Sequence, residues 1–147
     1  MDRSGRITNG FLLPIQDRIE IIPGDPTERL RKWASENAVQ LGLEAFGTAI
    51  DWSSLSHYEM DFDYEGSEHD IGALLRGSDL RTCGRLVVLT SHAEPLLLVT
   101  MEVFVEYWYS FWAASGYLQL IVLSENGRCF MEFEDNSFVL YSNFKIR

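Results

Sequence analysis

The chain has 147 residues, of which 46% are hydrophobic and 23% charged, so it has enough apolar material for one folded domain with a sizeable core. Its 22 Asp and Glu outnumber its 12 Lys and Arg, which gives a net charge of -10. Because phosphate contacts need Lys and Arg, this charge argues against nucleic-acid binding; it favours a basic protein partner or, more simply, solubility.

The first part of the chain predicts a short strand followed by a helix. Residues 19–22 suggest the strand, and the Pro-Gly pair at 23–24 ends it. Asp25 then provides an N-cap, Pro26 suits the first helical position, and Gly47 is expected to end the helix. The residues predicted to fall on one stripe of this helix are Leu30, Trp33, Ala34, Asn37, Leu41 and Ala45.

The stretch from His57 to Glu65 alternates strictly between apolar and polar residues, which is typical of a strand with one buried face. The residues predicted to pack on the core are Tyr58, Met60, Phe62 and Tyr64. The acidic residues predicted on the other face are Glu59, Asp61, Asp63 and Glu65. Alternate residues of a strand lie about 6.6 Å apart, so these carboxylates would form a row that either is screened by solvent or meets a cationic partner.

The middle of the chain predicts a helix and a pair of strands. Residues 68–76 form the expected helix, since Ser67 and Asp70 have the spacing of a capping box. Residues 85–90 are strongly strand-like, and residues 95–99 are expected to return beside them. One longer helix that starts in the turn between these two strands is the alternative.

The last third predicts an aromatic helix and then a meander. The pattern is helical from Thr100 to Ala114, and Gly116 suits the position just after the helix. The strands of the meander lie within residues 117–123, 129–134 and 138–141, with turns at 126–127 and 135–136. We therefore expect a single domain over residues 1–147 with an α+β fold: an antiparallel β-sheet of about five or six strands with two main helices.

Motifs for catalysis are absent from the sequence. It contains no GxxxxGK[ST], GxSxG, HExxH or EF-hand pattern. Cys83 and Cys129 lack the spacing of zinc ligands and are expected to be reduced thiols. We expect no enzymatic activity, no catalytic residue, no cofactor and no metal site; a small metal-dependent hydrolase that uses His57 and nearby acids is the less favoured alternative.

Membrane association is not expected. Residues 1–24 contain no apolar run that reads as a signal peptide. The most apolar window, Leu96 to Ser115, contains Glu102 and Glu106, which argues against a spanning helix. We therefore expect a cytoplasmic protein that is a monomer or a weak dimer.

The aromatic helix offers a second candidate surface. Glu102, Glu106, Tyr109 and Trp112 fall outside its inner stripe, and Tyr and Trp are frequent at interface hot spots. The alternative is that Tyr109 and Trp112 fill a second layer of core. The full set of predicted partner-binding residues is Glu59, Asp61, Asp63, Glu65, Glu68, Asp70, Glu102, Glu106, Tyr109 and Trp112.

Three segments within residues 100–147 carry a family resemblance: Phe111 to Tyr117, Ser124 to Gly127, and Leu140 to Phe144. With them, this acidic chain resembles the immunity proteins of bacterial polymorphic-toxin systems, including contact-dependent inhibition and Rhs-type toxins. The resemblance implies a stoichiometric inhibitor of a cognate toxin C-terminal domain, often a basic nuclease, and transfers no functional residue by position. An adaptor or accessory module that binds another basic protein is the alternative.

Overall fold

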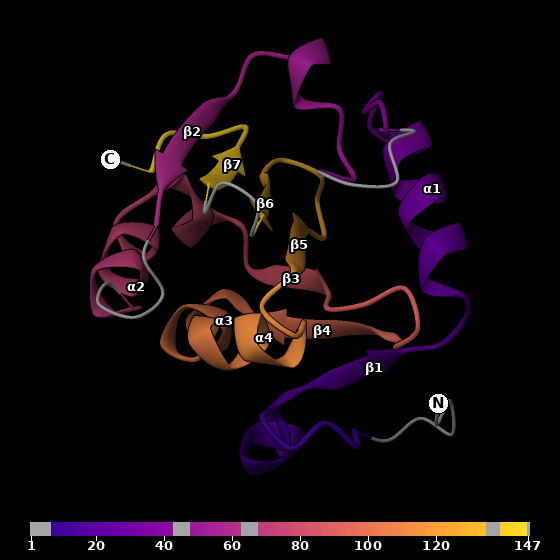
Figure 1. Ribbon diagram of the computed structural model, residues 1–147, viewed down its shortest axis with the longest axis vertical. Helices are drawn as coiled ribbons and strands as arrows, with labels where there is room; N and C mark the ends of the chain where they lie inside the picture. The colour runs from indigo at the N-terminus through magenta and orange to yellow at the C-terminus, as the bar shows by residue number, and fades with distance from the viewer. Residues whose placement is uncertain (1–6, 43–47, 63–67, 135–138, 147) are drawn as a thin grey trace.

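The structure is a computed structural model that describes residues 7–42, 48–62, 68–134 and 139–146, with the backbone alone at residues 68–70. These residues form one seven-stranded sheet, four α-helices and three short 3₁₀ helices (Figure 1). All neighbouring strands are antiparallel. The predicted α+β fold on an antiparallel sheet is confirmed, with seven strands rather than five or six.

The strand order is β1-β4-β3-β5-β6-β7-β2. The strands are β1 Glu20–Ile22, β2 Tyr58–Asp61, β3 Arg85–Leu89, β4 Leu96–Thr100, β5 Gln119–Ser124, β6 Phe130–Glu134 and β7 Val139–Ser142. The predicted pair β3–β4 and the C-terminal meander are therefore confirmed, and the alternative of a longer helix through Pro95 is wrong. Among the described residues, β1 and β2 form the two edges of the sheet, and each pairs there with one neighbouring strand.

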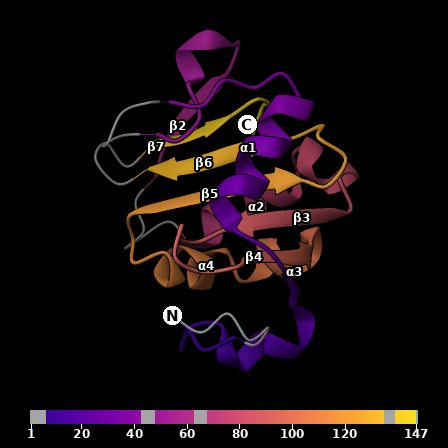
Figure 2. The same cartoon turned by 90° about the vertical axis from the view of Figure 1, so that its right-hand side faces the viewer.

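Helices cover both faces of the sheet (Figures 1 and 2). They are α1 Pro26–Glu36, α2 Glu68–Arg76, α3 Met101–Glu106, α4 Trp108–Ala114, and the 3₁₀ helices η1 Leu13–Arg18, η2 Trp52–Ser54 and η3 Asp79–Thr82. One core layer packs α2, α3 and α4 against side chains such as Val122 and Phe133. A second layer packs α1 and the segment containing η2 against the alternate residues, such as Ile121 and Leu123.

Helix α1 begins as predicted and ends earlier than expected. The Asp25 side chain accepts a hydrogen bond from Thr27 N at 2.9 Å, as an N-cap does. After Glu36 the chain turns through Ala38, whose φ is 55°. The expected continuation through Leu41 is wrong, because the Asn37 amide bonds back to the helix and Leu41 forms a β-bridge instead.

The aromatic helix expected from Thr100 to Ala114 is divided in two. The Thr100 side chain caps α3 by accepting from Val103 N at 3.2 Å. Tyr107 has φ -117° and ψ 24°, so the chain bends there before α4 begins. Gly116 follows α4 with φ 76°, which confirms its predicted place after the helix.

Candidate partner-binding surface

The acidic row begins on β2, at the edge of the sheet. Met60 and Phe62 are 8% and 5% exposed and pack in the core, while Glu59 and Asp61 are exposed. The predicted half-buried strand is therefore confirmed over these residues. Tyr58 was expected to point inward and is instead 50% exposed at the start of the edge strand.

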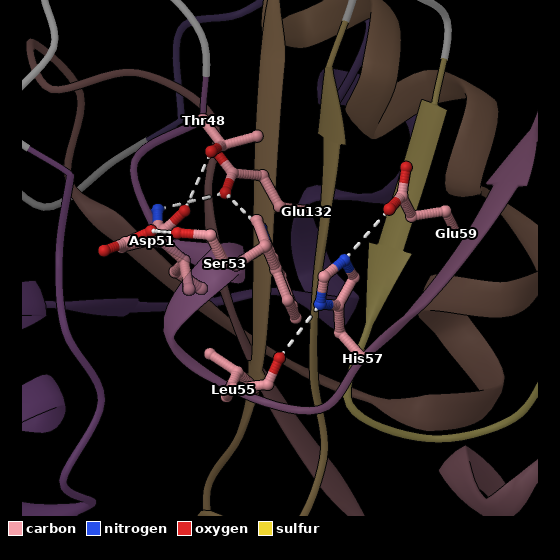
Figure 3. Close-up of polar contacts among 9 residues, drawn as sticks. Thr48, Asp51, Ser53, Leu55, His57, Glu59 and Glu132 are labelled. Carbon is pink, nitrogen blue, oxygen red and sulfur yellow. Dashed lines mark hydrogen bonds and ion pairs between the residues drawn. The ribbon is translucent and has the colours of Figure 1, made fainter.

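No Lys or Arg neutralises Glu59 or Asp61 among the described residues. The Lys and Arg ion pairs found there are Arg18–Glu106, Arg31–Glu28, Lys32–Glu36 and Arg85–Glu125. The charged neighbour of Glu59 is His57, whose Nε2 lies 3.0 Å from Glu59 Oε2 (Figure 3). Two exposed carboxylates thus stand on a strand whose opposite side is fixed in the core.

His57 faces two acceptors. Its Nδ1 lies 3.0 Å from the carbonyl oxygen of Leu55, and its Nε2 faces the Glu59 carboxylate. Only the imidazolium can donate to both, because the neutral ring has a single N–H. The Leu55 carbonyl raises the pKa of His57 most, burial opposes this, and Glu59 raises the pKa further. Protonation of His57 would therefore offset the charge of Glu59.

The segment that precedes β2 is attached to the sheet by one carboxylate, Glu132 of β6, which is 0% exposed. Its Oε2 accepts from Ala49 N at 2.7 Å and from Gln119 Nε2. Its Oε1 accepts from Ile50 N at 3.1 Å and from Trp52 Nε1 at 3.0 Å. Burial raises the pKa of Glu132, and the four N–H donors offset part of this rise.

Tyr141 of β7 lies between the two carboxylates. In the strand register it pairs with Glu132 on one side and with Glu59 on the other. Its ring stacks on Trp52, with centroids 5.7 Å apart and planes 17° apart. Burial raises the pKa of Tyr141, and Glu59, Glu134 and Glu132 raise it further. We call Glu59, Asp61 and the partly buried Tyr141 the acidic edge.

Sequence reasoning placed His57 and Glu59 on one face of the strand, as possible metal ligands, but missed Tyr141 and the anchoring role of Glu132. The available signal for Glu132 was an acid in a strand whose neighbours Met131 and Phe133 are apolar. The cross-strand row of Glu132, Tyr141 and Glu59 depends on pairings between distant segments.

The predicted residues on the aromatic helix lie apart from the acidic edge, in the helical layer on the other face of the sheet. Glu102 is exposed, Glu106 pairs with Arg18 at 3.8 Å, and Tyr109 is half-buried. Trp112 is 0% exposed and belongs to the core. Its prediction as a contact residue is therefore wrong, because its ring packs against the buried side chains of the helical layer.

Several predictions cannot be placed on this surface. Asp63 and Glu65 lie outside the described residues, and the side chains of Glu68 and Asp70 are not described. Also outside are Ala45, Gly47, Tyr64, Ser67 and the turn at 135–136. The acidic edge that the structure supports is therefore the part of the predicted row on β2, together with Tyr141.

No family model and no curated protein matches the chain. Within residues 7–42, 48–62, 68–134 and 139–146, no group of three or more His, Cys, Asp or Glu is placed to hold a metal ion. In the same ranges, none of the helices has the length and apolar character needed to cross a membrane. The structure is therefore that of an α+β protein with an acidic edge on its sheet. The resemblance to immunity proteins rests on the sequence alone.

Proposed function

We propose that this chain is an immunity protein that binds and neutralises a cognate bacterial toxin domain, a basic nuclease being the class best suited to its charge. The observation that carries the proposal is the exposure of Glu59 and Asp61 without a Lys or Arg partner among the described residues. Neighbouring like charges do not stabilise the fold, and a cationic partner would relieve their repulsion.

The way in which a nuclease binds its substrate supports the proposal of a nuclease partner. A nuclease binds phosphates through a positive groove, and a row of carboxylates on a rigid strand can occupy such a groove and exclude the substrate. The net charge of -10 would accelerate the encounter at long range. At short range, the exposed carboxylates of Glu59 and Asp61 suit ionic contacts with an Arg or Lys side chain of the partner.

The anchoring of β2 strengthens the proposal. Met60 and Phe62 bury one side of the segment in the core, and Glu132 holds the preceding loop through four donors. A surface that is ordered before binding loses less conformational entropy on association. The acidic edge therefore meets a basic partner as a preformed surface.

The direct test is co-expression with a candidate toxin domain, for which the product of the neighbouring gene is the first choice. We expect a stoichiometric complex on size-exclusion chromatography and rescue of cell growth. The double charge reversal Glu59→Lys/Asp61→Lys should weaken both the complex and the rescue of cell growth. The matched control Asp17→Lys/Glu20→Lys makes the same charge change at two exposed residues, one in η1 and one on β1, the opposite edge strand of the sheet. Equal rescue by the two variants would reject the acidic edge as the contact, and absence of any complex, with binding to a different basic protein, would favour an adaptor.

A further inference from the structure

A pocket of about 410 Å³ opens in the helical layer, between α2 and the bend that joins α3 to α4. The α2 wall contains Gly72, Ala73 and Arg76, and the bend contributes Tyr107, Trp108 and Tyr109. This volume falls in the range of about 300–1,000 Å³ that is usual for small-molecule sites. The pocket lies on the other side of the sheet from the acidic edge, and its chemistry is different.

The shape of the pocket follows from small residues on one wall and a bend on the other. A Cβ atom on Gly72 would lie 3.2 Å from the carbonyl oxygen of Val105, so α2 and α3 approach closely there. Ala73 is exposed and fills little of the space beside it. The bend at Tyr107 then redirects the chain, and the pocket opens between the residues of this bend and α2.

The charges in the pocket favour an anion. Arg76 lies one helical turn from Gly72 and lines the pocket. It forms no ion pair with the side chains that the structure describes. Glu106, the acid of the lining, is paired with Arg18 at 3.8 Å, and the Arg18 guanidinium lies 6.0 Å from the centre of the Tyr107 ring. A surplus positive charge therefore sits beside an aromatic wall in a chain whose net charge is -10.

We propose that this pocket binds a small molecule with a flat apolar body and one carboxylate. The body lies against Tyr107 and Tyr109, which are partly exposed, and the area removed from water favours binding; Trp108 is buried behind them. The carboxylate accepts hydrogen bonds from the Arg76 guanidinium, whose planar fork matches two oxygens. Ser110, a further residue of the lining, offers a hydroxyl to the same ligand. The proposal does not depend on toxin binding.

The test is a titration of the isotopically labelled full chain with naphthoate, followed by amide chemical shifts in nuclear magnetic resonance. Naphthyl methanol and naphthyl methylamine serve as neutral and cationic analogues of the same shape. We expect saturable shifts for naphthoate that concentrate at residues 72–76 and 105–110. The neutral analogue should bind about tenfold more weakly, since it lacks the charge-assisted bonds, and the cationic analogue more weakly still.

Two variants and one control complete the test. Arg76→Gln should weaken naphthoate binding about tenfold or more, and Ala73→Trp should abolish it by filling the pocket. Arg81→Gln removes an exposed arginine outside the pocket and should leave the affinity unchanged. Equal binding of the three probes, unchanged affinity in Arg76→Gln, or absence of saturable binding by the wild type would overturn the proposal. If Ala73→Trp fails to fold, Arg76→Gln decides the result, because Arg76 is exposed.

Discussion

Replacing Glu132 by Gln tests whether one buried carboxylate holds the loop before β2 against the sheet. One carboxylate oxygen accepts from Ala49 N and Gln119 Nε2, and the other accepts from Ile50 N and Trp52 Nε1. Gln converts one of these oxygens into an NH₂ group, which is itself a donor. In either orientation of the new amide, one pair of donors therefore faces another donor.

The less costly orientation directs the new NH₂ group toward Ala49 and Gln119, because the Gln119 amide can turn and accept. The Ala49 N–H then loses its acceptor, at a cost of about 1–3 kcal/mol. The two bonds to the remaining oxygen weaken from about 1.5–3 to about 0.5–1.5 kcal/mol each, and removal of a buried charge offsets part of this loss. We expect a net loss of about 2–3 kcal/mol, which would lower Tm by about 5–10 °C.

The assay is urea unfolding monitored by tryptophan fluorescence, supported by scanning calorimetry. Glu102→Gln is the matched control, since it makes the same chemical change at an exposed position and should stay within about 0.5 kcal/mol of the wild type. If Glu132→Gln is as stable as Glu102→Gln, the carboxylate does not anchor the loop, and the account of a preformed acidic edge loses its main support.

Three further predictions address other parts of the chain. The Leu55 carbonyl and, to a lesser degree, Glu59 raise the pKa of His57 from 6.5, although burial opposes this rise. The stabilising effect of the protonated ring is therefore complete below that value and is lost as pH rises through the folded pKa. In urea unfolding between about pH 5 and about pH 8, the wild type should lose more unfolding free energy with rising pH than His57→Gln, which lacks this titration. Gly127 has φ 77° and a side chain in the way of any Cβ, so Gly127→Ala should cost about 1–2 kcal/mol of unfolding free energy, whereas Gly10→Ala, with open space at its Cβ, should be near neutral. Trp112→Ala should cost about 3–5 kcal/mol by denaturant unfolding, and a small loss would show that its ring lies outside the core.

Local sequence patterns were sufficient to predict most of the helices, strands and turns. The alternation around Met60 and Phe62 predicts a half-buried strand because the side-chain period of a strand is 2. Asp25 predicts the start of α1 because its carboxylate can satisfy a free N–H of the first turn, as the structure shows. Gly127 marks the turn between β5 and β6 because it readily adopts positive φ, here 77°.

The features of the fold and of the acidic edge that the sequence did not predict depend largely on contacts between distant segments. Glu132 meets Ala49 and Trp52, which precede it by 83 and 80 residues, so no local pattern identifies it as an anchor. Helical spacing placed Trp112 off the inner stripe, but the bend at Tyr107 divides the helix, and Trp112 is 0% exposed. The end of α1 was also missed, since apolar spacing continues past the point where the backbone turns.

The most direct test of the acidic edge is the rate at which a purified cognate toxin domain, the partner proposed above, associates with this chain in stopped-flow mixing. At low ionic strength, Glu59→Lys/Asp61→Lys should slow association by about tenfold or more and reduce its dependence on salt. Asp17→Lys/Glu20→Lys carries the same net charge and should slow association much less. Equal slowing by both variants would show that total charge, and not the acidic edge, attracts the partner, and unchanged rates in both would contradict the proposed contact.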